Sequence, residues 1–247
     1  MTRLSVNVNK IALLRNSRTV GIPSVLRAAE LCVAAGAHGI TVHPRPDQRH
    51  IRPSDASELR DYLRDFPKIE FNIEGNPFPD FMDLVLELKP TQATLVPDEP
   101  SAATSDHGWD LQKVGKRLAP LVRTLNQSGI RVSLFMDVSS DQWARAREIG
   151  AERVELYTQS YAEAFARGSA TAALAACAAA ARSAQAVGLG VNAGHDLNLQ
   201  NLPDFCRIPG ILEVSIGHAL VSDALEVGLP AAVRAYLDVL RKHAPAA

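Results

Sequence analysis

The sequence is poor in the features that mark disulfide-rich and secreted proteins. Its 247 residues include three cysteines, which lie far apart and form no Cys-x-x-Cys pair. Cys32, Cys177 and Cys206 are therefore expected to be buried thiols in a reducing compartment, and neither a disulfide framework nor a zinc site. The N-terminus leads directly into a strand pattern, so no signal peptide is expected.

Charge and hydrophobicity exclude two further classes of protein. The formal net charge is -1 at pH 7, whereas a general nucleic-acid binder needs a basic excess. The longest apolar stretch, residues 170–181, is rich in alanine and ends at Arg182, which predicts a helix and not a membrane span. We therefore expect neither nucleic acid nor a membrane as a partner.

Strand and helix patterns alternate strictly along the chain. Eight segments alternate apolar and polar residues as strands do: residues 4–9, 39–43, 68–75, 93–97, 131–137, 153–158, 190–195 and 212–217. Helical spacing follows each strand after the first, at residues 53–66, 79–88, 109–129, 141–149, 161–166, 170–187, 199–206, 218–227 and 230–243. The first strand is followed by a predicted loop, residues 10–18, and then a helix, residues 23–36.

Eight strand–helix units in a chain of about 250 residues have the size of a closed α/β barrel. No glycine-rich nucleotide-binding motif of an open, doubly wound sheet is present. The sequence therefore predicts one domain, residues 1–247, folded as a (β/α)8 TIM barrel with extra helical segments.

One face of the predicted strands is repeatedly polar, while the opposite face carries Val, Ile and Leu. In a barrel the apolar face packs on the helices and the other face points inside, and active sites lie at the carboxyl ends of the strands. Ser133, Ser215 and Glu155 also fit a purely structural role, as hydrogen-bonded pairs inside the barrel. Glu70 lies between Ile69 and Phe71, so we interpret it as a partly desolvated acid/base, with an internal ion pair as the alternative.

Residues 39–51 combine a strand end with cationic and imidazole side chains. His43 ends the strand, and the following loop carries Arg45, Arg49 and His50. Arginine is suited to hold a phosphate and histidine to move protons, so this loop predicts a site for a phosphorylated carbonyl compound. The alternative is a polar surface loop beside a structural histidine.

The last two strands end in glycine next to histidine. Gly194-His195-Asp196 follows the seventh strand, and Gly217-His218 follows the eighth and opens a helix. In barrels, a phosphate is often held at this position by the N–H groups of a helix N-terminus. We interpret His195 as an acid and His218 as a phosphate ligand. A metal site is disfavoured, because no His-x-His or His-Glu-x-x-His pairing occurs and arginines lie near the histidines.

Four stretches together resemble the pyridoxine 5′-phosphate synthase family, which closes the ring of vitamin B6. They are residues 6–18, 39–51, 191–195 and 215–219. The resemblance implies condensation of 3-amino-2-oxopropyl phosphate with 1-deoxy-D-xylulose 5-phosphate, without a metal or an organic cofactor. It also implies a cytoplasmic homo-octamer built from dimers.

The resemblance also assigns roles to individual residues. His43, Glu70 and His195 match the family's acid/base residues. Arg45, His50 and Thr104 match contacts to the pentulose phosphate, and Asn7, Arg18, Gly217 and His218 match contacts to the amino-ketone phosphate. Many members have Asp-His at Asn9-Lys10 and Gly at Asp196, so we expect these three residues to change the substrate contacts.

Two other functions fit the same pattern. One is another phosphosugar isomerase or aldolase. Such an enzyme usually needs a Schiff-base lysine or a metal on a strand, and the only candidate for that lysine is Lys10, at the end of the first strand. The other is a barrel that binds a phosphorylated ligand without catalysis, and the joint presence of His43, Glu70 and His195 argues against it.

Overall fold

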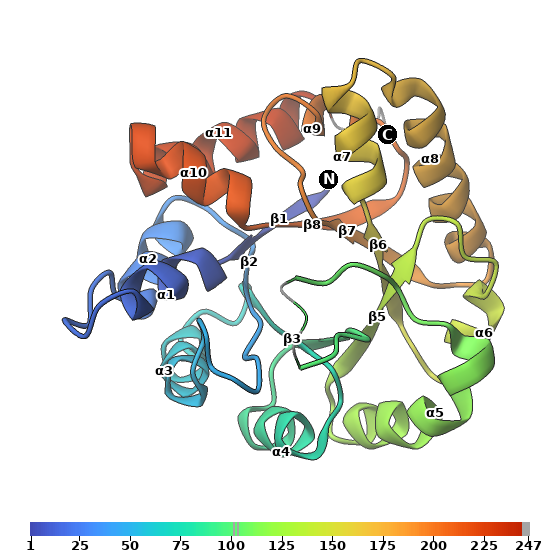
Figure 1. Cartoon of the computed structure of the whole chain (residues 1–247), viewed down its shortest axis with the longest axis horizontal. Coiled ribbons are helices and arrows are strands. Elements are labelled where there is room, and N and C mark those ends of the chain that lie inside the picture. The colour runs from blue at the N-terminus through green and yellow to red at the C-terminus, as the bar shows by residue number, and fades with distance from the viewer. Residues whose placement is uncertain (101, 103, 244–247) are drawn as a thin grey trace.

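The alternating segments form eight parallel strands that pair in chain order and close into a barrel (Figure 1). The computed structural model describes residues 1–100, 102 and 104–243. The strands are β1 (Arg3–Asn7), β2 (Gly39–Val42), β3 (Glu70–Gly75), β4 (Gln92–Leu95), β5 (Arg131–Asp137), β6 (Arg153–Tyr157), β7 (Gly190–Gly194) and β8 (Ile211–Ile216). The predicted (β/α)8 TIM barrel is confirmed.

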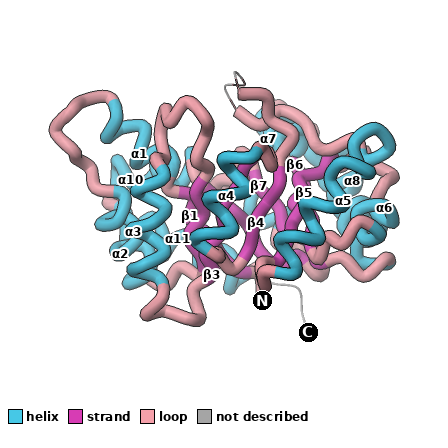
Figure 2. Tube along the Cα trace, turned by 90° about the horizontal axis from the view of Figure 1, so that it is seen from below, coloured by secondary structure: helices cyan, strands magenta, loops and turns pink. Residues whose placement is uncertain are grey.

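Helices surround the barrel. They are α1 (Asn9–Asn16), α2 (Val25–Ala34), α3 (Pro53–Leu63), α4 (Pro79–Leu88), α5 (Leu111–Gln127), α6 (Trp143–Glu148), α7 (Gln159–Ala166), α8 (Ala170–Ala186), α9 (Leu202–Phe205), α10 (His218–Val227) and α11 (Leu229–Lys242). Figure 2 shows the barrel from the side, with the N-terminus at one rim and the loops that follow the strands at the other. Within the described ranges, we find no helix with the length and apolarity needed to cross a membrane.

Helix α1 contradicts the prediction of a loop at residues 10–18. In this helix Leu13 and Leu14 are exposed while Arg15 is buried. The apolar residues therefore do not form one buried face, which is the pattern that predicts a helix. Arg15 pairs with Asp55 of α3 and donates to the backbone oxygen of His50 over 3.1 Å. This buried ion pair holds α1 against the next unit of the barrel, and apolar spacing could not predict it.

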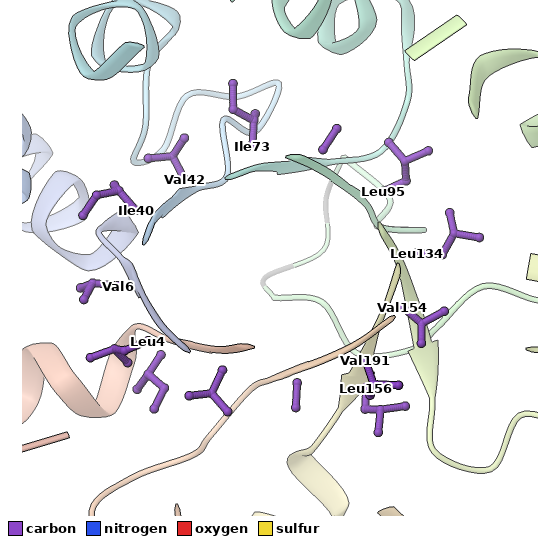
Figure 3. Close-up of a cluster of buried hydrophobic side chains, with 14 of the residues drawn as sticks. Leu4, Val6, Ile40, Val42, Ile73, Leu95, Leu134, Val154, Leu156 and Val191 are labelled. Atoms are coloured by element: carbon purple, nitrogen blue, oxygen red, sulfur yellow. The ribbon is translucent and has the colours of Figure 1, made fainter. Parts of the chain in front are cut away.

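The main apolar core lies between the strands and the helices. Leu4, Val6, Ile40 and Val42 are fully buried there, and Figure 3 shows such side chains on the outer side of the strand ring. Complete burial of each such side chain contributes about 1.5–3 kcal/mol. The barrel therefore takes its stability mainly from this outer layer, which leaves the interior free to carry polar groups.

Inside the barrel, polar side chains satisfy one another. The hydroxyls of Ser5 and Thr41 lie 2.7 Å apart, and Thr94 donates to Asn72 over 3.0 Å. Ser133, which the sequence left between a structural and a functional role, is fully buried beside this network and is an exception, because its Oγ has no hydrogen-bond partner among the described residues. These bonds compensate the desolvation of the interior.

Four charged residues gather where the strands begin, and we call them the basal cluster: Arg3, Glu70, Arg131 and Arg153. Each is the first residue of its strand, on β1, β3, β5 and β6. Glu70 lies 2.6 Å from Arg3 and 3.5 Å from Arg153, and it also pairs with Arg131. The cluster therefore ties four strands together at the amino-terminal rim.

Candidate active site

A cavity of about 380 Å³ opens at the carboxyl-terminal rim of the barrel. It is lined by the ends of β1, β2, β3, β6, β7 and β8 and by the loops that follow them. Most residues predicted from the sequence line it: Asn7, Asn9, Lys10, His43, Arg45, His50, Thr104, His195, Asp196, Gly217 and His218. Segments far apart in the chain thus converge on one site, as the barrel topology requires.

Glu70 does not line this cavity, so the structure does not place this predicted acid/base residue with the others. It lies in the basal cluster at the opposite rim, where its carboxylate is taken up by arginines. The internal ion pair that the sequence allowed is the arrangement found. Glu74, four residues later on the same strand face, lines the cavity instead.

His43 and Glu74 form the buried acid/base pair of the cavity. The distance from His43 Nδ1 to Glu74 Oε2 is 3.8 Å, and His43 Nε2 lies 4.0 Å from Asp98 Oδ2. Burial, and next the charge of Arg45, holds the pKa of His43 well below its usual range. Burial, and next the charge of Glu155, raises the pKa of Glu74 well above its usual range. Burial thus favours the neutral imidazole of His43 and the protonated carboxyl group of Glu74.

Arg45 is held by acceptors from the segment after β4. Its Nη2 donates to Asp98 Oδ2 over 2.6 Å, and its Nη1 donates to the backbone oxygen of Ala102 over 3.0 Å. Ser105 also donates to Asp98 Oδ2 over 2.6 Å, and Arg49 donates to the Ala102 oxygen over 2.9 Å. These bonds keep two guanidinium groups at the wall of the cavity, in reach of a phosphate.

The ring of His50 has one nitrogen occupied. The backbone N–H of Ile51 donates to His50 Nδ1 over 2.9 Å, so the neutral ring carries its proton on Nε2. Burial, and next the charge of Arg45, lowers the pKa of His50 to about 4. His50 is therefore a neutral donor near pH 7.

The end of β1 places Asn7, Asn9 and Lys10 beside these groups. Asn7 Oδ1 accepts from the backbone N–H of Asn9 over 3.0 Å, and Asn9 Oδ1 accepts from the backbone N–H of His43 over 2.9 Å. Asn9 thus supports the backbone of His43, a contact that needs only a side-chain oxygen. Lys10 is exposed at the cavity, and among the described residues it forms no ion pair.

His195 and Asp196 follow β7 with a left-handed backbone, at φ values of 80° and 58°. The imidazole packs edge-on against Tyr157, with ring centroids 5.0 Å apart, and lies 5.3 Å from the ring of Phe135. Burial lowers the pKa of His195, partly offset by the charge of Asp196. His195 is therefore a second neutral imidazole facing the cavity.

Gly217 and His218 place the start of α10 at the cavity. A Cβ atom on Gly217 would lie 3.1 Å from Asn7 Cβ, so glycine lets the two loops approach closely. The unpaired N–H groups of the first helical turn face an anion-binding position. Arg18 lies exposed in the loop after α1 and does not line the cavity of this chain.

The sequence pattern did not indicate an acid/base role for two carboxyl groups that lie in the barrel interior. Glu155 lines the cavity, and burial, with the charge of Glu213 next, raises its pKa to about 8. Glu213 is also buried and accepts from Asn192 Nδ2 over 3.3 Å. The alternation along β6 correctly predicts that Glu155 points into the barrel, but it does not show how far along the strand direction the residue lies. The same holds for Ser215, which also lines the cavity.

Comparison with known proteins gives one consistent family. The family described as "Pyridoxal phosphate biosynthesis protein PdxJ" matches residues 4–242. The pyridoxine 5′-phosphate synthase of Xanthomonas axonopodis pv. citri (strain 306) is 55% identical, over 97% of this chain and 97% of the relative. The enzyme of the same name from Albidiferax ferrireducens is 54% identical, over 96% of both chains.

Solved structures are similar in fold at low sequence identity. A phosphoribosyl anthranilate isomerase from Thermus thermophilus superposes with a TM-score of 0.60 and 16% identity, covering 98% of this chain and 99% of the other. A 4-hydroxy-2-oxoglutarate aldolase/2-deydro-3-deoxyphosphogluconate aldolase gives a TM-score of 0.63 and 16% identity, covering 96% and 94%. At this identity the likeness concerns the barrel fold alone.

Proposed function

The chain belongs to the PdxJ family of pyridoxal phosphate biosynthesis proteins, and we propose that its cavity closes the pyridoxine ring from two phosphorylated substrates. These are 3-amino-2-oxopropyl phosphate and 1-deoxy-D-xylulose 5-phosphate, and the products are pyridoxine 5′-phosphate, inorganic phosphate and water. Imine formation, enolisation, phosphate elimination and dehydration are successive proton transfers, so the reaction needs several poised acid/base groups around one cavity.

The observation that carries the proposal is a pair of anion-binding groups with acid/base residues between them. Arg45 and His50 follow β2, and Gly217 with His218 follows β8, while β1 separates these strands in the barrel. His43, Glu74 and His195 line the same cavity. A site for two phosphates with neutral proton carriers near both suits the condensation of two phosphorylated carbonyl compounds.

The pKa shifts support different acid/base roles for His43, Glu74 and His195. The neutral imidazole of His43 accepts a proton, and the neighbouring protonated Glu74 donates one. His195, also neutral, serves a step on the β7 side of the cavity. Glu74 takes the role that the resemblance had placed on Glu70.

The test is a product assay with each substrate alone and with both together. Formation of pyridoxine 5′-phosphate, identified by mass, with both substrates only is the expected result. A barrel that merely binds phosphorylated ligands would show a ligand-dependent rise in Tm without product. An aldolase using Lys10 would instead be trapped as a covalent adduct by borohydride with one substrate. Either outcome would overturn the proposal.

We also propose that the protein acts in the cytoplasm as a homo-octamer built from dimers. The exposed apolar residues Leu13, Leu14, Val20 and Ile22, on α1 and the loop after it, support an association surface there. Sedimentation velocity of the purified chain should give eight times the chain mass, and cell fractionation should recover it with cytoplasmic markers. A monomer at micromolar concentration, or recovery with the membrane or periplasmic fraction, would contradict this.

A further inference from the structure

The backbone at His195 needs support from its surroundings. His195 and Asp196 are consecutive residues with φ values of 80° and 58°, a region that side chains other than glycine seldom adopt. Such conformations persist where neighbouring groups over-determine them, and they are concentrated at functional sites. Because His195 lines the cavity, its backbone conformation decides where the imidazole ring lies.

Thr158 supplies this support from the neighbouring strand end. It directly follows β6, and its side chain is fully buried. Its Oγ1 lies 2.6 Å from the backbone oxygen of Gly194 and 2.6 Å from that of His195. The hydroxyl proton is thus shared between the two carbonyl oxygens that flank the start of the left-handed turn. The backbone N–H of Thr158 also donates to the Gly194 oxygen, over 3.0 Å.

Helix capping does not account for this threonine. Thr158 occupies the N-cap position of α7, where a threonine hydroxyl usually accepts from the first turn of the helix. Here its side chain makes no capping bond. The hydroxyl is committed to β7 instead, across 37 residues of sequence.

Other contacts complete the support around the turn. Asn201 Nδ2 donates to the backbone oxygen of Asp196 over 3.0 Å. The rings of Tyr157 and Phe135 pack against the imidazole. The aromatic rings limit where the imidazole can move, whereas Thr158 and Asn201 hold the backbone from which it projects.

We propose that Thr158 is a positioning residue, whose hydroxyl fixes the left-handed turn that aims His195 into the cavity. Thr158 does not line the cavity itself, so it acts through His195. The proposal rests on the proposed function only where turnover is measured. The position of the imidazole can be followed in the protein without substrate.

Two substitutions separate the hydroxyl from the shape of the side chain. Thr158→Val keeps the branched shape and removes the donor, while Thr158→Ser keeps the donor and removes a methyl group. We expect Thr158→Val to lower kcat roughly 10–100-fold with KM for both substrates within about twofold, since a small misplacement of a catalytic group has such an effect. Thr158→Ser should stay within about threefold of wild type in kcat, because the hydroxyl bond remains.

Thr2 offers a matched control at the opposite rim. It is also buried, and its Oγ1 donates to the backbone oxygen of Ile211 over 2.9 Å. Thr2→Val removes a comparable bond without a connection to His195. If Thr2→Val and Thr158→Val lower Tm similarly and only Thr158→Val lowers kcat, positioning is supported. Equal kcat in Thr158→Val and wild type, or equal losses in Thr158→Val and Thr158→Ser, would overturn it.

An NMR titration of the histidines gives a readout that needs no turnover. Release of the His195 ring from its buried place in Thr158→Val should raise its pKa toward the ordinary value, while Thr158→Ser should leave it low. An unchanged His195 titration in Thr158→Val would overturn the proposal even if the wild type proves inactive with the proposed substrates. Should Thr158→Val fail to fold, Thr158→Ala provides the same comparison with a smaller side chain.

Discussion

Glu74 Oε2 lies 3.8 Å from His43 Nδ1, and the pKa values of the two groups are displaced in opposite directions. The pKa of the carboxyl group is raised and the pKa of the imidazole is lowered, because burial disfavours the charged form of each group. Both shifts favour the uncharged forms, in which the carboxyl group can donate a proton and the imidazole can accept one. Five predictions concern this pair and other charged groups of the barrel.

Glu74→Gln should abolish most turnover. The amide keeps the shape and the hydrogen bonding of the carboxyl group but cannot exchange a proton, so a loss of roughly 10²–10⁴-fold in kcat is expected. Binding of each phosphorylated substrate, measured by calorimetry, should be retained. A kcat within about tenfold of wild type would rule out Glu74 as an essential acid/base.

Glu70→Gln is the matched comparison on the same strand. The change weakens the basal cluster, whose three arginines then face a neutral amide, so the free energy of unfolding should fall by roughly 1–3 kcal/mol. Turnover at a temperature well below Tm should remain near wild type. Loss of turnover in Glu70→Gln without loss of stability would restore the assignment drawn from the sequence.

Asp98→Asn should make the protein more responsive to phosphate. The change removes the charged acceptor that Arg45 and Ser105 share, which should lower the free energy of unfolding by roughly 1–3 kcal/mol. Inorganic phosphate offers Arg45 a replacement acceptor, so saturating phosphate should raise Tm more in Asp98→Asn than in wild type. An equal shift in both proteins, measured by scanning calorimetry, would show that Asp98 does not hold Arg45 at a phosphate position.

Lys10→Ala should raise KM more than it lowers kcat. The ammonium group lines the cavity without an ion-pair partner in the described part of the chain, and a bound phosphate would give it one. The loss should correspond to roughly 1.5–3 kcal/mol, and Lys10→His should recover part of it at lower pH, where the imidazole is charged. If Lys10 merely neutralises Asp196 or Glu74, the variant would lose Tm without ligand and keep its KM.

Glu213→Gln should change how stability depends on pH. Burial, and next the charge of Glu70, raises the pKa of Glu213 from 4.5 to about 7. Between these values the native protein holds a proton that the unfolded chain releases, so this residue makes stability fall as pH rises from about 4.5 to about 7. Denaturation series across this range should show a smaller fall in the variant. Parallel curves for the two proteins would contradict the shifted pKa.

The fold could be predicted because barrel strands have two different faces. Val6 packs outward and Asn7 lies at the cavity, and the same alternation recurs around the ring. The period of two gives the face of a residue but not its height along the strand. Glu70 and Glu74 share a face, and only the strand boundaries place one at each rim. The alternation alone therefore cannot choose between them.

Other parts of the site depend on contacts between distant segments. The bond from Thr158 to His195 and the pairing of Arg45 with Asp98 join residues 37 and 53 apart in the chain. Neither pair leaves a local pattern, and nothing in the residue type of His195 indicates a left-handed backbone. The histidines, glycines and arginines at strand ends could be found in the sequence because parallel strands bring all their carboxyl ends to one rim.

The four residues of the basal cluster are made at different times during synthesis of the chain. Arg3 precedes Glu70, but Arg131 follows it by 61 residues. At elongation rates of about 5–20 residues per second, Glu70 waits roughly 3–12 s for Arg131 to be made. For these seconds the nascent chain can form only the Arg3–Glu70 pair of the cluster. We expect the first strands to settle into their final arrangement only after β6 has emerged.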